Sequence, residues 1–242
     1  PEDTLDDAQK NKLHSMIRKA RITENDHVLE IGCGWGGFAM EAVRQTGCKV
    51  TGITVSAAQY EYARELVRKA GLEERITILL RDYRAMKGIF DKIVSIEMLE
   101  AVGHRYLGTF FKYCDNLLKQ GGLIALQTIT IPDQHYDVYR KETDWIRKHI
   151  FPGGHLPSLT AISRAMTNHS SLMIDHMENI GLNYARTLRE WRRRFLDNID
   201  AVSRMGFDRK FQRKWIYYFA CCEAGFTARV VGNVQIVLNR PG

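Results

Sequence analysis

The chain has few of the residues that mark secreted, metal-binding or membrane-spanning proteins. Its 242 residues include five cysteines and five prolines, and the cysteines at 33, 48, 114, 221 and 222 lack the paired spacing of a zinc site. No apolar run approaches the roughly 20 residues of a transmembrane helix, and these residues contain no recognisable secretory signal. We therefore expect reduced thiols, no bound metal and a cytoplasmic location.

The apolar content and the alternation of segments predict one α/β domain over residues 1–242. Hydrophobic residues make up 45% of the chain, enough for a full core. Helices are predicted at 5–20, 37–46, 56–70 and 105–119, and strands at 27–31, 48–54, 75–81, 91–97 and 122–130. This alternation is typical of a doubly wound, mostly parallel sheet, in which ligands bind at the carboxyl ends of the strands.

The alternation of predicted strands and helices ends after the fifth strand. Residues 131–170 are predicted to be helical with breaks at prolines and glycines, and we interpret them as a cap over the ligand pocket. A sixth strand is predicted at 172–178, a helical pair at 183–203 and 208–224, and a seventh strand at 226–238.

The positive charge is concentrated in the helical pair. The chain carries a net charge of +7, and residues 183–214 hold ten Lys or Arg against four Asp or Glu, a local charge of +6. A solvated helix face and a surface for anionic headgroups or nucleic acid both fit this charge, and charge alone does not choose between them.

The segment with the clearest chemistry is a glycine-rich turn that follows an apolar strand. It reads Val-Leu-Glu-Ile-Gly-Cys-Gly-Trp-Gly-Gly over residues 28–37 and precedes a predicted helix. Gly32, Gly34 and Gly36 allow a ligand to approach the backbone closely, while Cys33 and Trp35 lie between them. The turn predicts a nucleotide-like ligand at the start of the helix.

Two features favour S-adenosylmethionine (SAM) over a dinucleotide. Glu30 precedes the turn, where its carboxylate would accept hydrogen bonds from an ammonium group but would repel a pyrophosphate. No acid ends the second strand, where an NAD enzyme would use one to bind the ribose hydroxyls. Since SAM has an amino group and no phosphate, we interpret the turn as a SAM site.

At this point the sequence resembles the cyclopropane fatty acid synthase family of SAM-dependent methyltransferases, which includes mycolic acid cyclopropane synthases. The resemblance spans about residues 5–240. It rests on the glycine turn, on seven further segments and on two aromatic positions: Thr51–Gln59, Arg81–Arg84, Val94–Gly103, Ile150–Gly154, Leu156–Ser158, Asn183–Leu188, Tyr217–Cys222, Trp191 and Phe195. It implies a class I, Rossmann-like fold. Thr54, Ser56 and Gln59 are then expected on the ribose and adenine side of SAM, with Asp82, Tyr83 and Arg84 flanking the adenine.

The family's reaction, as the resemblance implies it, adds a methylene bridge across a cis double bond of a phospholipid acyl chain. Methyl transfer leaves a carbocation, and a bound bicarbonate is thought to remove a proton so that the ring closes. Glu100, Tyr184 and the backbone at Ile129 match bicarbonate-binding positions. Gln127 stands where the family has histidine, so it can donate a hydrogen bond but cannot carry charge. Cys222 matches a cysteine often designated as the active-site residue, and we expect it to line the pocket.

Several alternatives stay open. The product could carry a methyl branch instead of a ring, and the chain could methylate another lipid or a small amine. A family segment that precedes the first helix is not found in this sequence, so a chain that starts at Pro1 could have an incompletely assembled site. It would then be a catalytically silent SAM- or lipid-binding module.

The expected partners are unsaturated phospholipid acyl chains and an anionic membrane surface. Arg192, Arg193 and Arg194, on a helix with Trp191 and Phe195, are the predicted lipid-facing cluster, which implies peripheral membrane association. Nucleic acid is not expected, because no target motif such as Asn-Pro-Pro-Tyr is present. A homodimer is left open.

Overall fold

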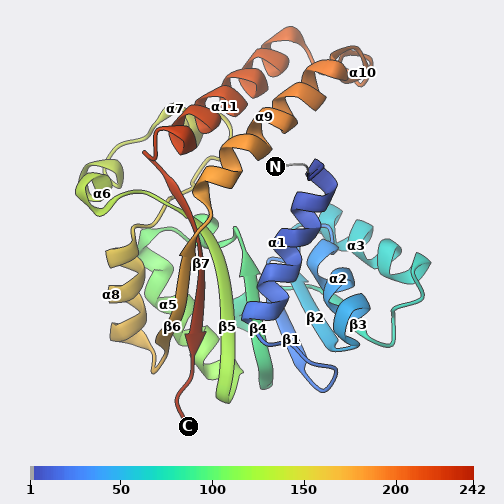
Figure 1. The fold of residues 1–242 in the computed structure, drawn as a ribbon, viewed down its shortest axis with the longest axis vertical. Coiled ribbons are helices and arrows are strands. Elements are labelled where there is room, and N and C mark those ends of the chain that lie inside the picture. Colours follow the sequence, from blue (N-terminus) through green and yellow to red (C-terminus); the bar gives the residue numbers. More distant parts are fainter. Residues whose placement is uncertain (1–2) are drawn as a thin grey trace.

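A computed structural model of the chain describes residues 3–242 and contains one seven-stranded sheet with helices on both faces (Figure 1). The strand order is β3-β2-β1-β4-β5-β7-β6. The strands are β1 (His27–Ile31), β2 (Lys49–Thr54), β3 (Ile76–Leu80), β4 (Phe90–Ile96), β5 (Leu118–Thr130), β6 (Met173–Asn179) and β7 (Gly232–Asn239). β7 is antiparallel to both of its neighbours, and the other neighbouring strands are parallel. The predicted fold class is confirmed.

The helices form two layers and an arm. Their bounds are α1 (Leu5–Lys19), α2 (Gly37–Thr46), α3 (Ala57–Lys69), α4 (Leu99–Val102), α5 (Leu107–Leu117), α6 (Asp133–Tyr139), α7 (Trp145–His149), α8 (Leu159–His169), α9 (Gly181–Asp197), α10 (Ile199–Arg204) and α11 (Arg209–Thr227), with 3₁₀ turns at Tyr83–Ala85 and His104–Tyr106. Helices α9 to α11 rise from the sheet as an arm above the carboxyl ends of the parallel strands (Figure 1).

Alternation along the strands explains why both faces of the sheet are covered. Val28 and Val94 point into a core with α1, α2 and α3. Their neighbours Leu29 and Ile93 point into the opposite core with α5 and α8. Successive residues of a strand face opposite sides of the sheet. Strands whose residues are apolar on both sides therefore need a helical layer on each face.

Two sequence predictions need correction. The seventh strand was predicted at 226–238, but α11 continues to Thr227 and β7 begins only at Gly232. Phe226 is a buried residue of the arm, and its hydrophobicity suits a helix face as well as a strand. The predicted cap at 131–170 does not include α8, because Ile162 and Met166 of this helix pack in the core against α5. Trp145 of α7 packs against Tyr217 of α11 in the arm, with ring centroids 4.5 Å apart.

The structure also bears on the membrane predictions. Among residues 3–242, no helix is both long enough and apolar enough to cross a membrane.

Candidate functional site

The glycine turn has the backbone conformation that its sequence requires. Gly32, Gly34 and Gly36 have φ angles of 82°, 53° and 86°, a region that side chains rarely adopt. The carbonyl of Ile53 on β2 accepts hydrogen bonds from the N–H groups of Gly32, at 3.0 Å, and Cys33, at 2.9 Å. Gly36 then caps α2. The turn is thus fixed to the sheet and delivers the start of a helix at the carboxyl end of β1.

The three glycines differ in what surrounds them. A Cβ at Gly32 would lie 2.7 Å from the side chain of Met98, and one at Gly36 would lie 3.2 Å from Ala63. A Cβ at Gly34 would meet no atom within 4 Å. Gly34 therefore borders open space, where a ligand can approach, whereas Gly32 permits contact with the segment after β4.

Glu30 is the residue that best fits the ammonium group of SAM. Its side chain is buried, and among the described residues its Oε2 atom has no hydrogen-bond partner. Burial raises the pKa of this carboxyl well above its ordinary value. A buried, unpaired acceptor beside a glycine turn calls for a donor, and the ammonium group of SAM would supply one.

The residues predicted to meet the ribose and adenine make hydrogen bonds with one another. The Thr54 hydroxyl donates to Gln59 Oε1 at 2.7 Å and accepts from the Ser56 N–H at 3.2 Å. Ser56 also caps α3 by accepting from the Gln59 N–H at 3.4 Å. Capping and ligand binding are compatible here, because hydroxyl and amide groups each retain further hydrogen-bonding capacity.

One aromatic side chain, Trp35, lies within the glycine turn, and aromatic and charged side chains follow β3. Trp35 is 55% exposed and packs edge-on against Tyr62, with ring centroids 5.2 Å apart. Tyr83 packs against Phe110 instead of standing free. Asp82 accepts from Arg84, which holds the pKa of Asp82 below its usual value. Residues 82–84 therefore form a rigid corner at the end of β3.

Cys33 is buried within the turn. Burial raises the pKa of its thiol to about 12, so it stays protonated at neutral pH and serves as a packing residue.

A buried polar cluster lies at the ends of β4 and β5, centred on a residue that the sequence analysis did not select. Glu97 Oε1 accepts from Gln127 Nε2 at 2.9 Å, from Asn233 Nδ2 at 2.7 Å and from the Tyr184 hydroxyl. Gln127 Nε2 is also 3.1 Å from the Tyr184 oxygen. Glu97 therefore receives the side-chain donors that the sequence assigned to bicarbonate.

Glu100, the predicted catalytic glutamate, lies in the same cluster. Its Oε1 accepts from the Ile129 N–H at 2.5 Å, whereas Oε2 is buried and has no partner among the described residues. Burial, and then the nearby charge of Glu97, raises the pKa of Glu100 to about 7. This carboxyl is thus poised to exchange a proton near neutral pH.

Sheet register brings these residues together from distant parts of the chain. Gln127 on β5 is opposite both Ile96 on β4 and Gln235 on β7. Ile129 is opposite Asn233. Glu97 directly follows β4 with a φ of 54°, which turns its side chain toward β5 and β7.

The sequence did contain a signal for two of the missed residues. Glu97 is a second acid in the Val94–Gly103 motif, three residues before Glu100. Asn233 lies on the same face of β7 as Gln235, and both are buried in an otherwise apolar strand. Buried polar residues at alternate strand positions indicate a shared partner, but only the pairing of β5 with β7 reveals which partner it is.

Tyr184 and Cys222 belong to the arm above this cluster. Tyr184 is buried against Phe226 and reaches down to Glu97. Cys222 packs in the same apolar group as Phe219, and burial raises the pKa of its thiol to about 12. A protonated thiol of this kind is a poor nucleophile, so Cys222 is not suited to nucleophilic catalysis. That Cys222 lines the ligand pocket stays a prediction.

The predicted bicarbonate does not fit this arrangement. Gln127 and Tyr184 already donate to Glu97, and the Ile129 N–H already donates to Glu100. A third anion would meet two carboxyl groups and would find each of these expected donors engaged, so we derive no step through bicarbonate.

A cavity of about 780 Å³ lies between α1 and α9 and reaches the cluster. Its lining includes Leu5, Ala8, Lys12, Leu182 and Tyr184. Among these, Lys12 is close enough to the cluster that the charge of Glu97 partly offsets the lowering of its pKa by burial. Most of the other lining residues are polar or charged, so the cavity gives a largely polar route from the surface to Tyr184.

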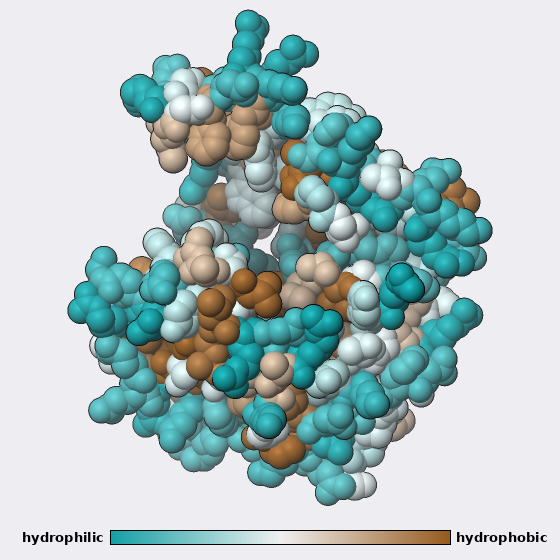
Figure 2. All heavy atoms as spheres, turned by 180° about the vertical axis from the view of Figure 1, so that it is seen from behind, coloured by the Kyte–Doolittle hydropathy of each residue, from teal (hydrophilic) through white to brown (hydrophobic). Residues whose placement is uncertain are grey.

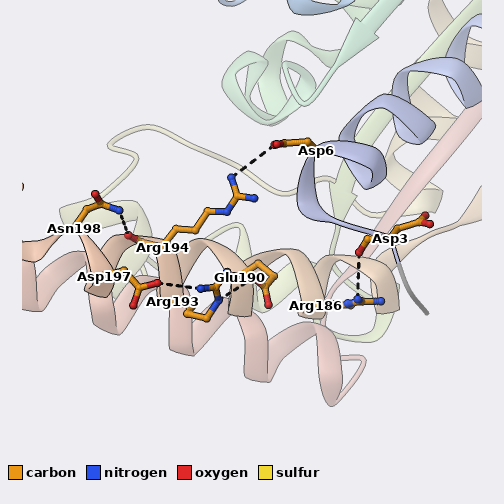
Figure 3. Close-up of polar contacts among 8 residues, drawn as sticks. All are labelled: Asp3, Asp6, Arg186, Glu190, Arg193, Arg194, Asp197 and Asn198. Atoms are coloured by element: carbon orange, nitrogen blue, oxygen red, sulfur yellow. Dashed lines mark hydrogen bonds and ion pairs between the residues drawn. The ribbon is translucent and has the colours of Figure 1, made fainter.

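Two arginines that line this cavity, Arg193 and Arg194, pair with acidic groups (Figure 3). Arg194 lies 3.6 Å from Asp6 on α1, and Arg193 pairs with Glu190 and Asp197 of its own helix. Arg192 pairs with Glu223 at 2.9 Å. The three arginines therefore pair with acids on three different helices, α1, α9 and α11.

The fold and the sequence both match known lipid-modifying enzymes. A model of the mycolic acid cyclopropane synthetase family matches residues 1–236. Tuberculostearic acid methyltransferase of Mycobacterium tuberculosis is 39% identical over 97% of this chain and 55% of its own length. Cyclopropane-fatty-acyl-phospholipid synthase of Escherichia coli K12 is 36% identical over 98% of this chain and 59% of its own length.

A solved structure of a mycolic acid cyclopropane synthase is also similar to this chain. A mycolic acid cyclopropane synthase crystallised with SAH and CTAB superposes with a TM-score of 0.89 at 25% identity, over 98% of this chain and 86% of that one. The chain spans a little over half the length of the two curated relatives. By its sequence match across nearly all of its length, the chain belongs to the mycolic acid cyclopropane synthetase family.

Proposed function

We propose that the chain is the catalytic region of a SAM-dependent enzyme that adds a one-carbon unit across a cis double bond of a phospholipid acyl chain. The observation that carries this proposal is the contact between the glycine turn and the carboxyl cluster. Gly32 adjoins the side chain of Met98, which directly follows Glu97 and lies two residues before Glu100. A methyl donor on the turn would thus lie beside the half-buried carboxyl groups of Glu97 and Glu100.

This arrangement suits the demands of the reaction. An alkene is a neutral, weak nucleophile, so catalysis depends on holding it against the methyl donor in a site without water. SAM would supply the electrophilic methyl group. The chain's own residues would hold the acyl chain under the arm, stabilise the positive charge that develops on it, and accept one proton. Glu97 and Glu100 provide negative charge at that place.

The family relatives support both a ring and a branch as the product. One relative is named a cyclopropane synthase and another a tuberculostearic acid methyltransferase. We propose the cyclopropane as the main product, because a base close to the new methyl group closes the ring. Because the donors expected to hold bicarbonate are engaged with Glu97 and Glu100, bicarbonate is not part of this proposal.

The test is an assay with vesicles of unsaturated phospholipid and SAM. The full-length protein should produce acyl chains heavier by one methylene group, detected by mass spectrometry, with the upfield proton signals of a cyclopropane ring in NMR spectra. Vesicles with saturated chains are the control and should give no product. Methylation of added small amines without any change in the lipid would contradict the proposal.

We also propose that the outer end of the arm binds an anionic membrane surface. Met205 and Phe207, which are 74% and 40% exposed, lie in a segment that holds three cations, Arg204, Arg209 and Lys210, and one acid, Asp208, which caps α11. Figure 2 shows hydrophilic side chains beside paler, more apolar ones at the end of the arm. Exposed apolar residues among cations are suited to a lipid interface, where each cation contributes about 1 kcal/mol.

Neutralising this tip should weaken membrane binding. Replacing Arg204, Arg209 and Lys210 by Gln should reduce co-sedimentation with anionic vesicles at low salt and leave SAM affinity unchanged. The matched control replaces Arg192, Arg193 and Arg194 by Gln, which removes the same charge from residues already paired with acids, and should have the smaller effect. Equal vesicle binding by wild type and the tip variant would show that lipid binds elsewhere.

A further inference from the structure

Glu97 occupies the position that a bound anion would need. Its Oε1 atom accepts three hydrogen bonds, from Gln127, Asn233 and Tyr184. These donors converge from β5, β7 and α9, so the protein has built a complete anion-binding site around its own side chain.

The backbone supports a functional reading of Glu97. Its φ of 54° lies in the left-handed region, which is costly for a residue with a Cβ and is kept where the surrounding structure demands it. Gln127 is itself fixed in orientation, since its Oε1 accepts from Gln235 Nε2 at 2.9 Å. The amide must therefore present its N–H groups to Glu97 and Tyr184. This glutamine suits a site with a resident carboxylate, because the amide donates without adding charge.

We propose that the Glu97 carboxylate is the base of the reaction, in place of bicarbonate; this rests on the proposed function. The π electrons of the alkene form the bond to the incoming methyl carbon, and the sulfur keeps the electrons of the bond that breaks. The cation left on the acyl chain is then deprotonated at the new methyl group by Glu97. The electrons of that C–H bond close the ring, and Glu97 passes its proton to solvent.

The first test asks whether the enzyme depends on bicarbonate. Wild-type turnover in carbon-dioxide-depleted buffer should be the same as with added sodium bicarbonate. Glu97→Gln should lower turnover by about 100-fold or more, as expected for loss of a general base, with unchanged SAM affinity. Glu97→Asp should recover part of the rate. A wild-type rate that collapses without bicarbonate, or a Glu97→Gln variant with full activity, would overturn the proposal.

A second test does not depend on turnover. Glu97→Ala should vacate the anion site and leave the donors of Gln127, Asn233 and Tyr184 free. Calorimetric titration with sodium bicarbonate should therefore show binding to Glu97→Ala and none to wild type, and bicarbonate should restore part of the variant's activity. Binding to wild type would show that the anion site is not filled by Glu97. An inactive wild type would contradict the proposed function alone, because the titration still reports what fills this site.

Discussion

Gly34→Val should lose measurable SAM binding while the protein stays folded. Because a Cβ at Gly34 would meet no protein atom within 4 Å, the added side chain would extend into the space that the ligand needs. Its φ of 53° adds strain of about 1–2 kcal/mol, which lowers stability without removing the sheet. Calorimetric titration with SAM measures the affinity, and circular dichroism reports the fold.

Gly71→Val is the matched control for this experiment. Gly71 directly follows Ala70, the C-cap of α3, and has a φ of 65°. A Cβ at Gly71 would also meet no atom within 4 Å. The control therefore carries the same backbone strain but lies outside the glycine turn, and it should bind SAM as wild type does. Unchanged SAM affinity in Gly34→Val would show that the ligand site is placed wrongly.

Glu100→Gln should lower turnover by about 100-fold and leave SAM affinity unchanged. The amide oxygen can still accept from the Ile129 N–H, so the local backbone is preserved. What is lost is a buried negative charge beside the developing carbocation, and such preorganised groups are typically worth 100-fold or more. Single-turnover rates with unsaturated phospholipid measure the effect. A variant with the wild-type rate would remove Glu100 from the mechanism.

The same substitution should have a distinct signature in stability. The pKa of Glu100 is about 7 in the folded protein against an ordinary 4.5, because burial and Glu97 disfavour its charge. Below pH 4.5 the carboxyl is protonated in both states and contributes nothing. As pH rises to about 7 the unfolded chain ionises first, so the free energy of unfolding of the wild type falls.

Glu100→Gln removes this penalty and should be more stable than wild type above pH 7, by on the order of 3 kcal/mol. The difference should vanish near pH 4. Urea unfolding at several pH values measures it. Glu178→Gln is the control, since the ion pair with Lys19 lowers the pKa of that exposed carboxyl and its removal should bring no gain at high pH. A variant whose advantage does not depend on pH would show that Glu100 does not titrate as described.

Local sequence patterns were sufficient to predict most of the helices and strands and the glycine turn. Apolar segments predicted seven strands, and the glycines after β1 predicted a tight turn, at which the structure has positive φ angles at Gly32, Gly34 and Gly36. Glu30 could also be selected, because an acid at the buried end of a strand stands out in an apolar sequence. The boundary between α11 and β7 was predicted wrongly, because Phe226 fits either element and only packing in the arm decides.

By itself, the sequence determined the order of strands and helices, the conformation of the glycine turn and the presence of acids after β4, since each depends on neighbours within a few residues. The tertiary structure alone decided what those acids contact. Glu97 gained its role because β5, β7 and α9 bring Gln127, Asn233 and Tyr184 to one carboxylate, across separations of 30 to 136 residues. The tertiary structure also pairs Arg192, Arg193 and Arg194 with different acids. Contacts of this range depend on strand register and helix packing, which no local pattern encodes.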